Sequence, residues 1–146
     1  MFAVLWSGST LAQPSEAEMI KVFNDICISG FPAHTQIEQR LSANGFVKKE
    51  RGIWDHPNYG ALAPNRSGNR EIKSCSLVSR DDLKSIGVAD QLQRSIGQLG
   101  IAVTTAERHG VRLSVDFVQS GRKGRVTVDP ARGGRAVLAV FPLEEK

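Results

Sequence analysis

"VRLSVDFVQ", residues 111–119, places apolar and polar side chains at alternate positions. Leu113, Val115 and Phe117 would share one face of an extended chain, and Ser114 and Asp116 would share the other. A period of two predicts a β-strand with one buried face and one face in contact with water. Strands with this pattern are typical of antiparallel sheets.

Three neighbouring segments extend this pattern: IAVTTAER (101–108), RVTVD (125–129) and RAVLAVF (135–141). Short glycine-containing turns separate the segments: HG (109–110), SGRKG (120–124) and PARGG (130–134). Glycine suits such turns because it adopts positive φ without steric cost. We therefore expect a four-stranded antiparallel meander. Its last strand is apolar on both faces, which predicts an interior strand or one covered by a helix.

Capping signals predict two helices near the N-terminus. Ser15 and Glu18 fit a capping box before EAEMIKVFNDICIS (16–29), in which apolar residues recur every three or four positions. Thr35 and Glu38 fit a second capping box before QIEQRLSAN (36–44). Gly45 is expected to end that helix in the left-handed conformation, with Phe46 against Leu41.

A third helix is predicted in the middle of the chain. Ser79 and Asp82 match another N-terminal cap, and the following sequence has apolar residues at helical spacing up to Gly100, with a break near Gly87. Residues 46–54 are expected to form short strands or a broken hairpin, and EIKSCSLVS (71–79) a strand. Asp55–Asn69 is rich in Pro, Gly and Asn and is predicted to be a loop.

These elements together predict an α+β fold. It has two N-terminal helices, a third central helix and an antiparallel β-meander with the helices packed on one face. The chain has 146 residues, of which 40% are hydrophobic and 23% charged, as expected for one compact globular domain.

The first twelve residues resemble the end of a secretory signal peptide. The apolar run MFAVLW precedes small residues that include Thr10 and Ala12, where cleavage would fall. A basic start is missing and the apolar run is short, so a short N-terminal strand or tail is the alternative. We expect residues 1–12 to be a leader remnant, 13–146 to be the domain, and the location to be periplasmic or secreted. The apolar run is also too short to span a membrane.

Cys27 and Cys75 are the two cysteines of the chain. Cys27 falls on the apolar face of the first predicted helix, and Cys75 lies in a predicted strand that this helix could cross. An even number of cysteines in an oxidising compartment favours a disulfide. A free, reactive thiol is the alternative, but neither cysteine has a base or a cluster of positive charge nearby in the sequence.

Several classes of function find no support in the sequence. The three histidines have no metal-ligand spacing, and phosphate-binding glycine loops and nucleophile-elbow motifs are missing, so neither a metal nor a cofactor is expected. Nucleic-acid binding is not expected either, because aromatic residues are few and the net charge of +4 is not concentrated along one helix.

Two groups of residues are candidate contacts for a partner. The first combines aromatic and basic side chains around the predicted loop: Trp54, His56, Tyr59, Arg66 and Arg70. The second contains arginines of predicted hairpin turns that would meet at one end of the meander: Arg112, Arg132 and Arg135. Trp54 could equally be a core residue, and arginines in turns are often merely solvated.

The sequence predicts a small secreted or periplasmic, non-enzymatic domain that binds a protein or an anionic ligand. The alternative is a small hydrolase or thiol enzyme, with a site assembled from Asp55, His56, Cys27 or Cys75. The identity of the ligand and the oligomeric state do not follow from the sequence.

Overall fold

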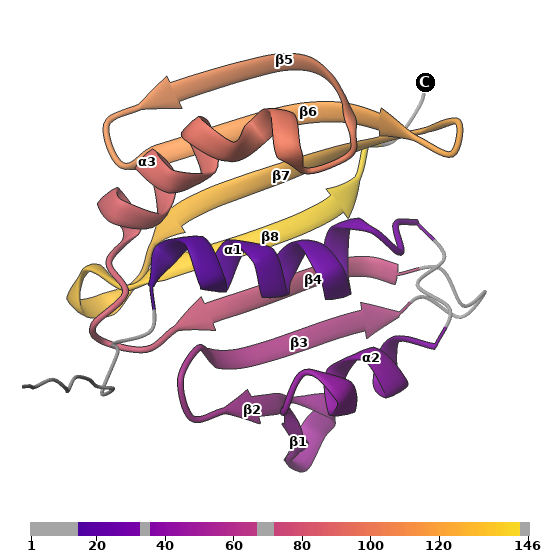
Figure 1. Cartoon of the computed structure of the whole chain (residues 1–146), viewed down its shortest axis with the longest axis vertical. Coiled ribbons are helices and arrows are strands. Elements are labelled where there is room, and N and C mark those ends of the chain that lie inside the picture. The colour runs from indigo at the N-terminus through magenta and orange to yellow at the C-terminus, as the bar shows by residue number, and fades with distance from the viewer. Residues whose placement is uncertain (1–14, 33–35, 67–71, 144–146) are drawn as a thin grey trace, which may run out of the picture.

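A computed structural model describes residues 15–32, 36–66 and 72–143 (Figure 1). Three α-helices occur in these ranges: α1 (Glu16–Phe23), α2 (Ile37–Ala43) and α3 (Ser85–Ser95). A π-helical segment, Asn24–Ile28, continues α1 without interruption. The leader-like residues 1–12, Thr35 and Arg70 lie outside the described ranges.

Eight strands form one antiparallel sheet. In chain order they are β1 (Val47–Lys48), β2 (Trp54–His56), β3 (Gly60–Arg66), β4 (Ile72–Ser79), β5 (Ala102–His109), β6 (Arg112–Gln119), β7 (Arg122–Pro130) and β8 (Ala136–Pro142). Their order across the sheet is β1-β2-β3-β4-β8-β7-β6-β5. The expected α+β fold and the C-terminal meander are therefore confirmed, and β8 is an interior strand between β4 and β7.

The sheet consists of two halves, each made of four strands that are consecutive in the chain. Helices α1 and α2 followed by β1–β4 form one half, and helix α3 followed by β5–β8 forms the other. The last strands of the two halves, β4 and β8, pair at the centre with Leu77 opposite Leu138. Helices α1 and α3 lie side by side across the same face of the sheet (Figure 1).

The hydrophobic core lies between the helices and this face. Alternate residues of β6, Leu113, Val115 and Phe117, are buried there as the sequence pattern predicts. Met19 and Phe23 of α1 are fully buried against the sheet side. Each completely buried large side chain stabilises the fold by about 1.5–3 kcal/mol relative to its exposed state.

The capping patterns in the sequence correctly predict the start of α1 and the end of α2. Ser15 and Glu18 form the complete capping box, with the Glu18 amide donating to Ser15 Oγ at 3.1 Å and the Ser15 amide donating to Glu18 Oε1 at 3.1 Å. Gly45 has φ 87°, and the Phe46 amide donates to the Leu41 carbonyl at 3.0 Å, as expected for the end of α2. At the start of α2, Gln36 occupies the capping position, with φ 62°.

Two predictions for the middle of the chain are wrong. Residues 55–66, predicted to be a loop, contain the end of β2 and all of β3, which pairs along its length with β4. Ser79 does not cap a helix, because α3 begins at Ser85 and has Lys84 at its capping position. α3 also runs through Gly87 without the predicted break.

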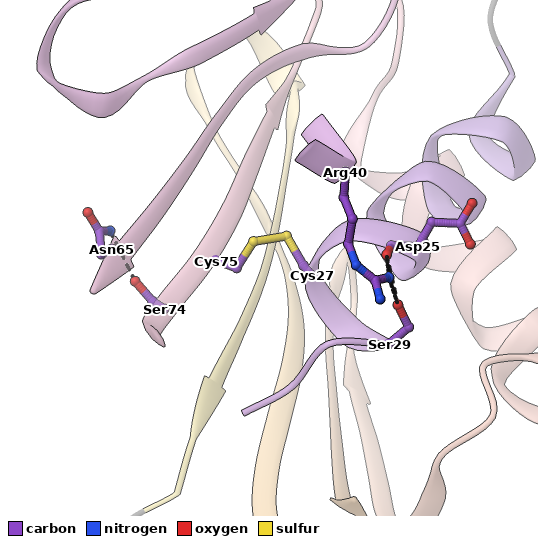
Figure 2. The surroundings of a disulfide bond; sticks show 7 residues. All are labelled: Asp25, Cys27, Ser29, Arg40, Asn65, Ser74 and Cys75. Carbon is purple, nitrogen blue, oxygen red and sulfur yellow. Dashed lines mark hydrogen bonds between the residues drawn. A yellow bond between two sulfur atoms is a disulfide. The ribbon is translucent and has the colours of Figure 1, made fainter. Parts of the chain in front are cut away.

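The predicted disulfide joins Cys27 in the π-helical segment to Cys75 in β4 (Figure 2). Both cysteines are fully buried, and their Cα atoms are 5.6 Å apart. Arg40 of α2 donates to the Asp25 carbonyl at 3.0 Å and to Ser29 Oγ at 3.1 Å, which ties α2 to the same turn. The disulfide and these hydrogen bonds hold the N-terminal helices against the sheet. Within the described residues, no helix has the length and apolar character that crossing a membrane requires.

Candidate functional site

The face of the sheet opposite α1 and α3 carries no helix of the described chain (Figure 1). We call it the open face. Its centre is formed by small side chains from β3, β4, β8, β7 and β6: Ala61, Ala63, Ser76, Val78, Val137, Ala139, Thr127 and Ser114. They alternate along the strands with buried core residues and are themselves only partly buried. The open face is thus broad, largely uncharged at its centre and in contact with solvent.

Two ion pairs lie beside this centre, on β6 and β7. Arg125 donates through Nε and Nη2 to the two carboxylate oxygens of Asp116, at 2.5 and 3.0 Å. Arg112 Nη1 lies 3.4 Å from Asp129 Oδ1. The hydrogen bond from Arg125 is the main reason that the pKa of Asp116 falls below its ordinary value of 3.8. Both arginines are therefore already partnered by carboxylates.

The two ends of the open face are hollowed. At the end that contains the β6–β7 turn, a hollow of about 460 Å³ has Thr105, Asp116, Val118 and Lys123 among its lining residues. At the other end, a hollow of about 230 Å³ is lined in part by Asp55, Ala61, Val78, Arg80, Asp81 and Arg135. The centre of the open face therefore lies between two recesses with charged rims.

The turn arginines share one end of the meander. The β5–β6 and β7–β8 turns lie at the same end because the four strands are antiparallel neighbours. Arg112 pairs with Asp129, and Arg135 Nε lies 3.6 Å from Asp81 Oδ1. Arg132 is exposed and has no ion pair with any residue in the described ranges. This end is basic, but most of its positive charges have acidic neighbours.

The aromatic residues of the first candidate group lie on the helix side. Trp54 is 6% exposed and belongs to the core, which resolves the two alternatives for this residue in favour of packing. Tyr59 packs against the same core and is partly buried. Burial, with a smaller contribution from the negative charge of Glu18, raises the pKa of Tyr59 above 10.0.

His56 lies between two aromatic rings. Its ring centroid is 5.0 Å from that of Phe46 and 4.5 Å from that of Tyr59. The Asn58 amide donates to His56 Nδ1 at 3.0 Å. Burial disfavours the imidazolium and lowers the pKa of His56 below 6.5. These contacts pack His56 of β2 between the α2–β1 connection and the β2–β3 turn. Arg66 ends β3, on the neighbouring strand.

The residues proposed for an enzyme do not form a catalytic arrangement. Cys27 and Cys75 are bonded to each other, so neither is a free nucleophile. Asp55 and His56 are consecutive residues of β2, and consecutive side chains of a strand face opposite sides of the sheet. Within the described ranges, no group of three or more His, Cys, Asp or Glu side chains could hold a metal ion.

The small residues at the centre of the open face were not among the predicted site residues. The alternation in β6, β7 and β8 does assign them to the solvent side of their strands. It does not show that β3 and β4 continue this surface, because the sequence of β3 predicts a loop. Comparison of the chain with protein-family models, with curated proteins and with solved structures gives no significant match.

Proposed function

We propose that this chain is a small non-enzymatic binding domain whose open face docks onto an acidic protein partner. The observation that supports the proposal most is the broad surface of small side chains on one side of the sheet, with the α-helices of the described residues on the other side. Short side chains such as Ala63, Ser76 and Ala139 leave room for larger side chains of a partner to approach the sheet.

The size of the open face suits a protein rather than a small molecule. Six of its strands, β3 to β8, have seven to nine residues each. With strands about 4.8 Å apart and a rise of about 3.4 Å per residue, six such strands present roughly 700 Å². A standard protein interface buries about 800 Å² on each partner, which is close to this value.

The charge distribution favours an acidic partner. The chain has a net charge of +4, and basic side chains stand at both ends of the open face: Lys123 at one end, and Arg132 beside the Asp81-paired Arg135 in the β7–β8 turn region at the other. Carboxylates on a partner could pair with these groups while apolar side chains contact the centre. Such charges mainly increase the association rate and make it sensitive to salt.

A periplasmic or secreted location is part of the proposal. Residues 1–12 resemble the end of a signal peptide, and the buried Cys27–Cys75 disulfide suits an oxidising compartment. Sequencing the N-terminus of the mature protein from its native host tests this part. A start near Gln13 supports it, and retention of residues 1–12 contradicts it.

The docking surface can be tested with two variants that change the charge equally. Ala139→Glu places a large anionic side chain at the centre of the open face, whereas Ile86→Glu places one on α3, where Ile86 is 52% exposed. Both variants are first compared with the wild type by circular dichroism and thermal unfolding. Proteins retained by each immobilised form from the extracellular fraction of the native host are then quantified by mass spectrometry.

The expected result is that at least one protein is retained equally by the wild type and by Ile86→Glu and is not retained by Ala139→Glu.

A further inference from the structure

The hairpin at the β1 edge of the sheet stands at one end of the molecule. We call residues 47–53 the edge hairpin; they contain β1, the turn Glu50–Gly52 and Ile53. All of these residues are exposed, and β1 pairs on one side only, with β2. In Figure 1, β1 lies at the bottom and β5 at the top, at opposite ends of the longest axis. The edge hairpin is therefore accessible to a large partner.

The base of the edge hairpin is held by the core. Phe46 and Trp54, which flank it in the chain, are 3% and 6% exposed. Within the hairpin, the Lys49 amide donates to the Ile53 carbonyl at 2.7 Å, and the Ile53 amide donates to the Glu50 carbonyl at 3.3 Å. These bonds give the tip of the hairpin a defined shape on a buried base.

Two aliphatic side chains of the edge hairpin are exposed on the same side of the sheet. Val47 is 57% and Ile53 is 39% exposed, and they are two of the four large hydrophobic residues exposed among those that the structure describes. Val47 pairs with Asp55, and Lys48 pairs with Trp54. Because alternate residues of a strand share a face, Val47 and Ile53 point away from the side on which Trp54 is buried. As diagonal neighbours they form one apolar patch.

Basic side chains surround this apolar patch. The edge hairpin contains three cations, from Lys48, Lys49 and Arg51. The neighbouring acids are Glu50 in the turn, Asp55 opposite Val47, and Glu38 of α2, which lies 3.9 Å from Lys48. Lys49 and Arg51 have no ion pair within the part of the chain that the structure describes. The two cations nearest the tip can therefore pair with negative groups of a partner.

Arg51 adopts a backbone conformation that favours glycine. Its φ is 61°, and the following Gly52 has φ 74°. A residue other than glycine is uncommon in this region because its Cβ crowds the backbone, and such residues cluster at functional sites. Glycine would fit this position more easily, so an arginine here points to a role for its side chain.

We propose that the edge hairpin binds the surface of a membrane that contains anionic lipids. Val47 and Ile53 enter the boundary between headgroups and acyl chains, while Lys49 and Arg51 pair with lipid phosphates. A membrane suits the hairpin better than a protein does, because the hairpin projects and lines neither hollow of the open face. A soft lipid interface receives a projecting aliphatic side chain without a preformed pocket, whereas protein hot spots lie in packed pockets.

The binding test mixes the full chain with vesicles of phosphatidylcholine alone, or of phosphatidylcholine with an equal amount of phosphatidylglycerol. Sedimentation of the vesicles measures the bound fraction. We expect binding to the mixed vesicles only, and weaker binding as salt increases, because salt screens the attraction. No binding to mixed vesicles, or equal binding to both kinds, overturns the proposal. The assay contains no partner protein, so its outcome does not depend on the proposed docking of the open face.

The apolar patch is tested by a double variant, Val47→Ser with Ile53→Ser. It should bind the mixed vesicles about tenfold more weakly, because it removes most of the apolar surface of the hairpin. The control is Ile86→Ser with Val103→Ser, since these residues are 52% and 38% exposed elsewhere on the molecule. The control should bind like the wild type. Circular dichroism and thermal unfolding first establish that all variants are folded.

The cations are tested by Lys49→Gln with Arg51→Gln, which should also weaken binding to the mixed vesicles by about tenfold. Lys123→Gln with Arg132→Gln is the control, because it lowers the net charge equally at other exposed positions. An equal loss with both double variants would mean attraction by net charge alone and would overturn the proposal. Unchanged vesicle binding by the hairpin variants, with loss of a protein retained by the wild type, would assign the hairpin to a protein interface and overturn it as well.

Entry into the lipid is measured with Ile53→Trp. Its tryptophan emission should shift to shorter wavelength when mixed vesicles are added, because the indole ring leaves water for the interface. Ile86→Trp on α3 is the control and should show no shift. An unchanged emission for Ile53→Trp would show that the hairpin does not enter the membrane surface, and would overturn the proposal.

Discussion

The hydroxyl of Ser79 joins three segments of the chain. Ser79 Oγ accepts from the Ala136 amide at 2.9 Å and donates to the Leu83 carbonyl at 2.6 Å, and Ser79 is 1% exposed. The S-x-x-D pattern around Ser79 predicts a helix cap, but the hydroxyl is used by a residue 57 positions away. A local pattern cannot reveal such a partner, because the partner is brought near only when β8 pairs with β4.

Ser79→Ala is expected to lower the free energy of unfolding by about 1–3 kcal/mol, because the Ala136 amide and the Leu83 carbonyl both lose a buried partner. Chemical denaturation of the purified variant measures this loss. Ser76→Ala, on the open face of the same strand, is the matched control and should change stability by less than about 0.5 kcal/mol. Equal effects of the two substitutions would show that the bridge made by Ser79 does not stabilise the fold.

The Asp116–Arg125 pair predicts a dependence of stability on pH. The pKa of Asp116 is lower in the folded protein than its ordinary value of 3.8, so ionised Asp116 stabilises the fold above that value. This contribution is lost as the pH falls through 3.8 toward the folded pKa. Unfolding measured from neutral pH to about pH 2 should show a shallower acid loss for Asp116→Asn than for the wild type. Parallel pH profiles would contradict the prediction.

At the scale of elements, the sequence predicted those features that depend on neighbouring residues. Ser15 with Glu18 and Gly45 with Phe46 are caps made within one turn, and both have the predicted partners. β3 was missed because Gly60, Pro64 and Asn65 disfavour strands, and pairing with β4 overrides that preference. Helix periodicity and strand alternation are therefore dependable here, whereas sheet pairing is not visible locally.

Substitution by alanine is expected to have opposite effects on stability at Gly124 in β7 and at Gly87 in α3. A Cβ on Gly124 of β7 would lie 2.6 Å from Phe117 Cζ and 2.7 Å from Phe31 Cζ. Those two rings pack edge to face, with centroids 5.1 Å apart. Gly124→Ala should therefore lower the free energy of unfolding by about 1–3 kcal/mol through overpacking. Thermal and denaturant unfolding measure the change.

Gly87→Ala is the comparison for Gly124→Ala. A Cβ on Gly87 would meet Glu16 Oε2 at 2.8 Å, but this is the end of a flexible side chain that can move. Alanine also favours the interior of α3, so the variant should gain up to about 1 kcal/mol. A loss as large as that of Gly124→Ala would show that α1 and α3 cannot adjust at this contact.

At the scale of the whole molecule, the two halves share one sheet. Alternation predicted which side of β6, β7 and β8 faces solvent, and so part of the open face. It did not predict that β4 and β8 join the halves at the centre, since that pairing depends on residues far apart in the chain. From the sequence, the candidate site could therefore be predicted only as the solvent-facing sides of separate strands, and not as one continuous surface.

The proposed docking surface predicts how two substitutions and the salt concentration change the affinity of the whole protein for its partner. With a purified partner, calorimetry should show that Ala139→Glu weakens binding at least tenfold, while Ile86→Glu leaves the dissociation constant unchanged. Affinity for an acidic partner should also fall as salt increases, because the basic ends of the face are screened. Equal binding by both variants, or a failure to find any protein that distinguishes them, would overturn the proposed docking surface.

The stability of the fold is expected to depend on the Cys27–Cys75 disulfide, which links the N-terminal helical region to β4. The cysteines are 48 residues apart in the chain, and closing a loop of this length in the unfolded state stabilises the fold by about 4 kcal/mol on a chain-entropy model. The double variant Cys27→Ala, Cys75→Ala should therefore lose about 2–4 kcal/mol in denaturant unfolding. Because both sulfurs are buried, the reductant should act on the wild type mainly after unfolding, and then lower its midpoint toward that of the variant. If the variant is as stable as the oxidised wild type, the hydrogen bonds from Arg40 and the apolar core hold α1 on the sheet without the disulfide.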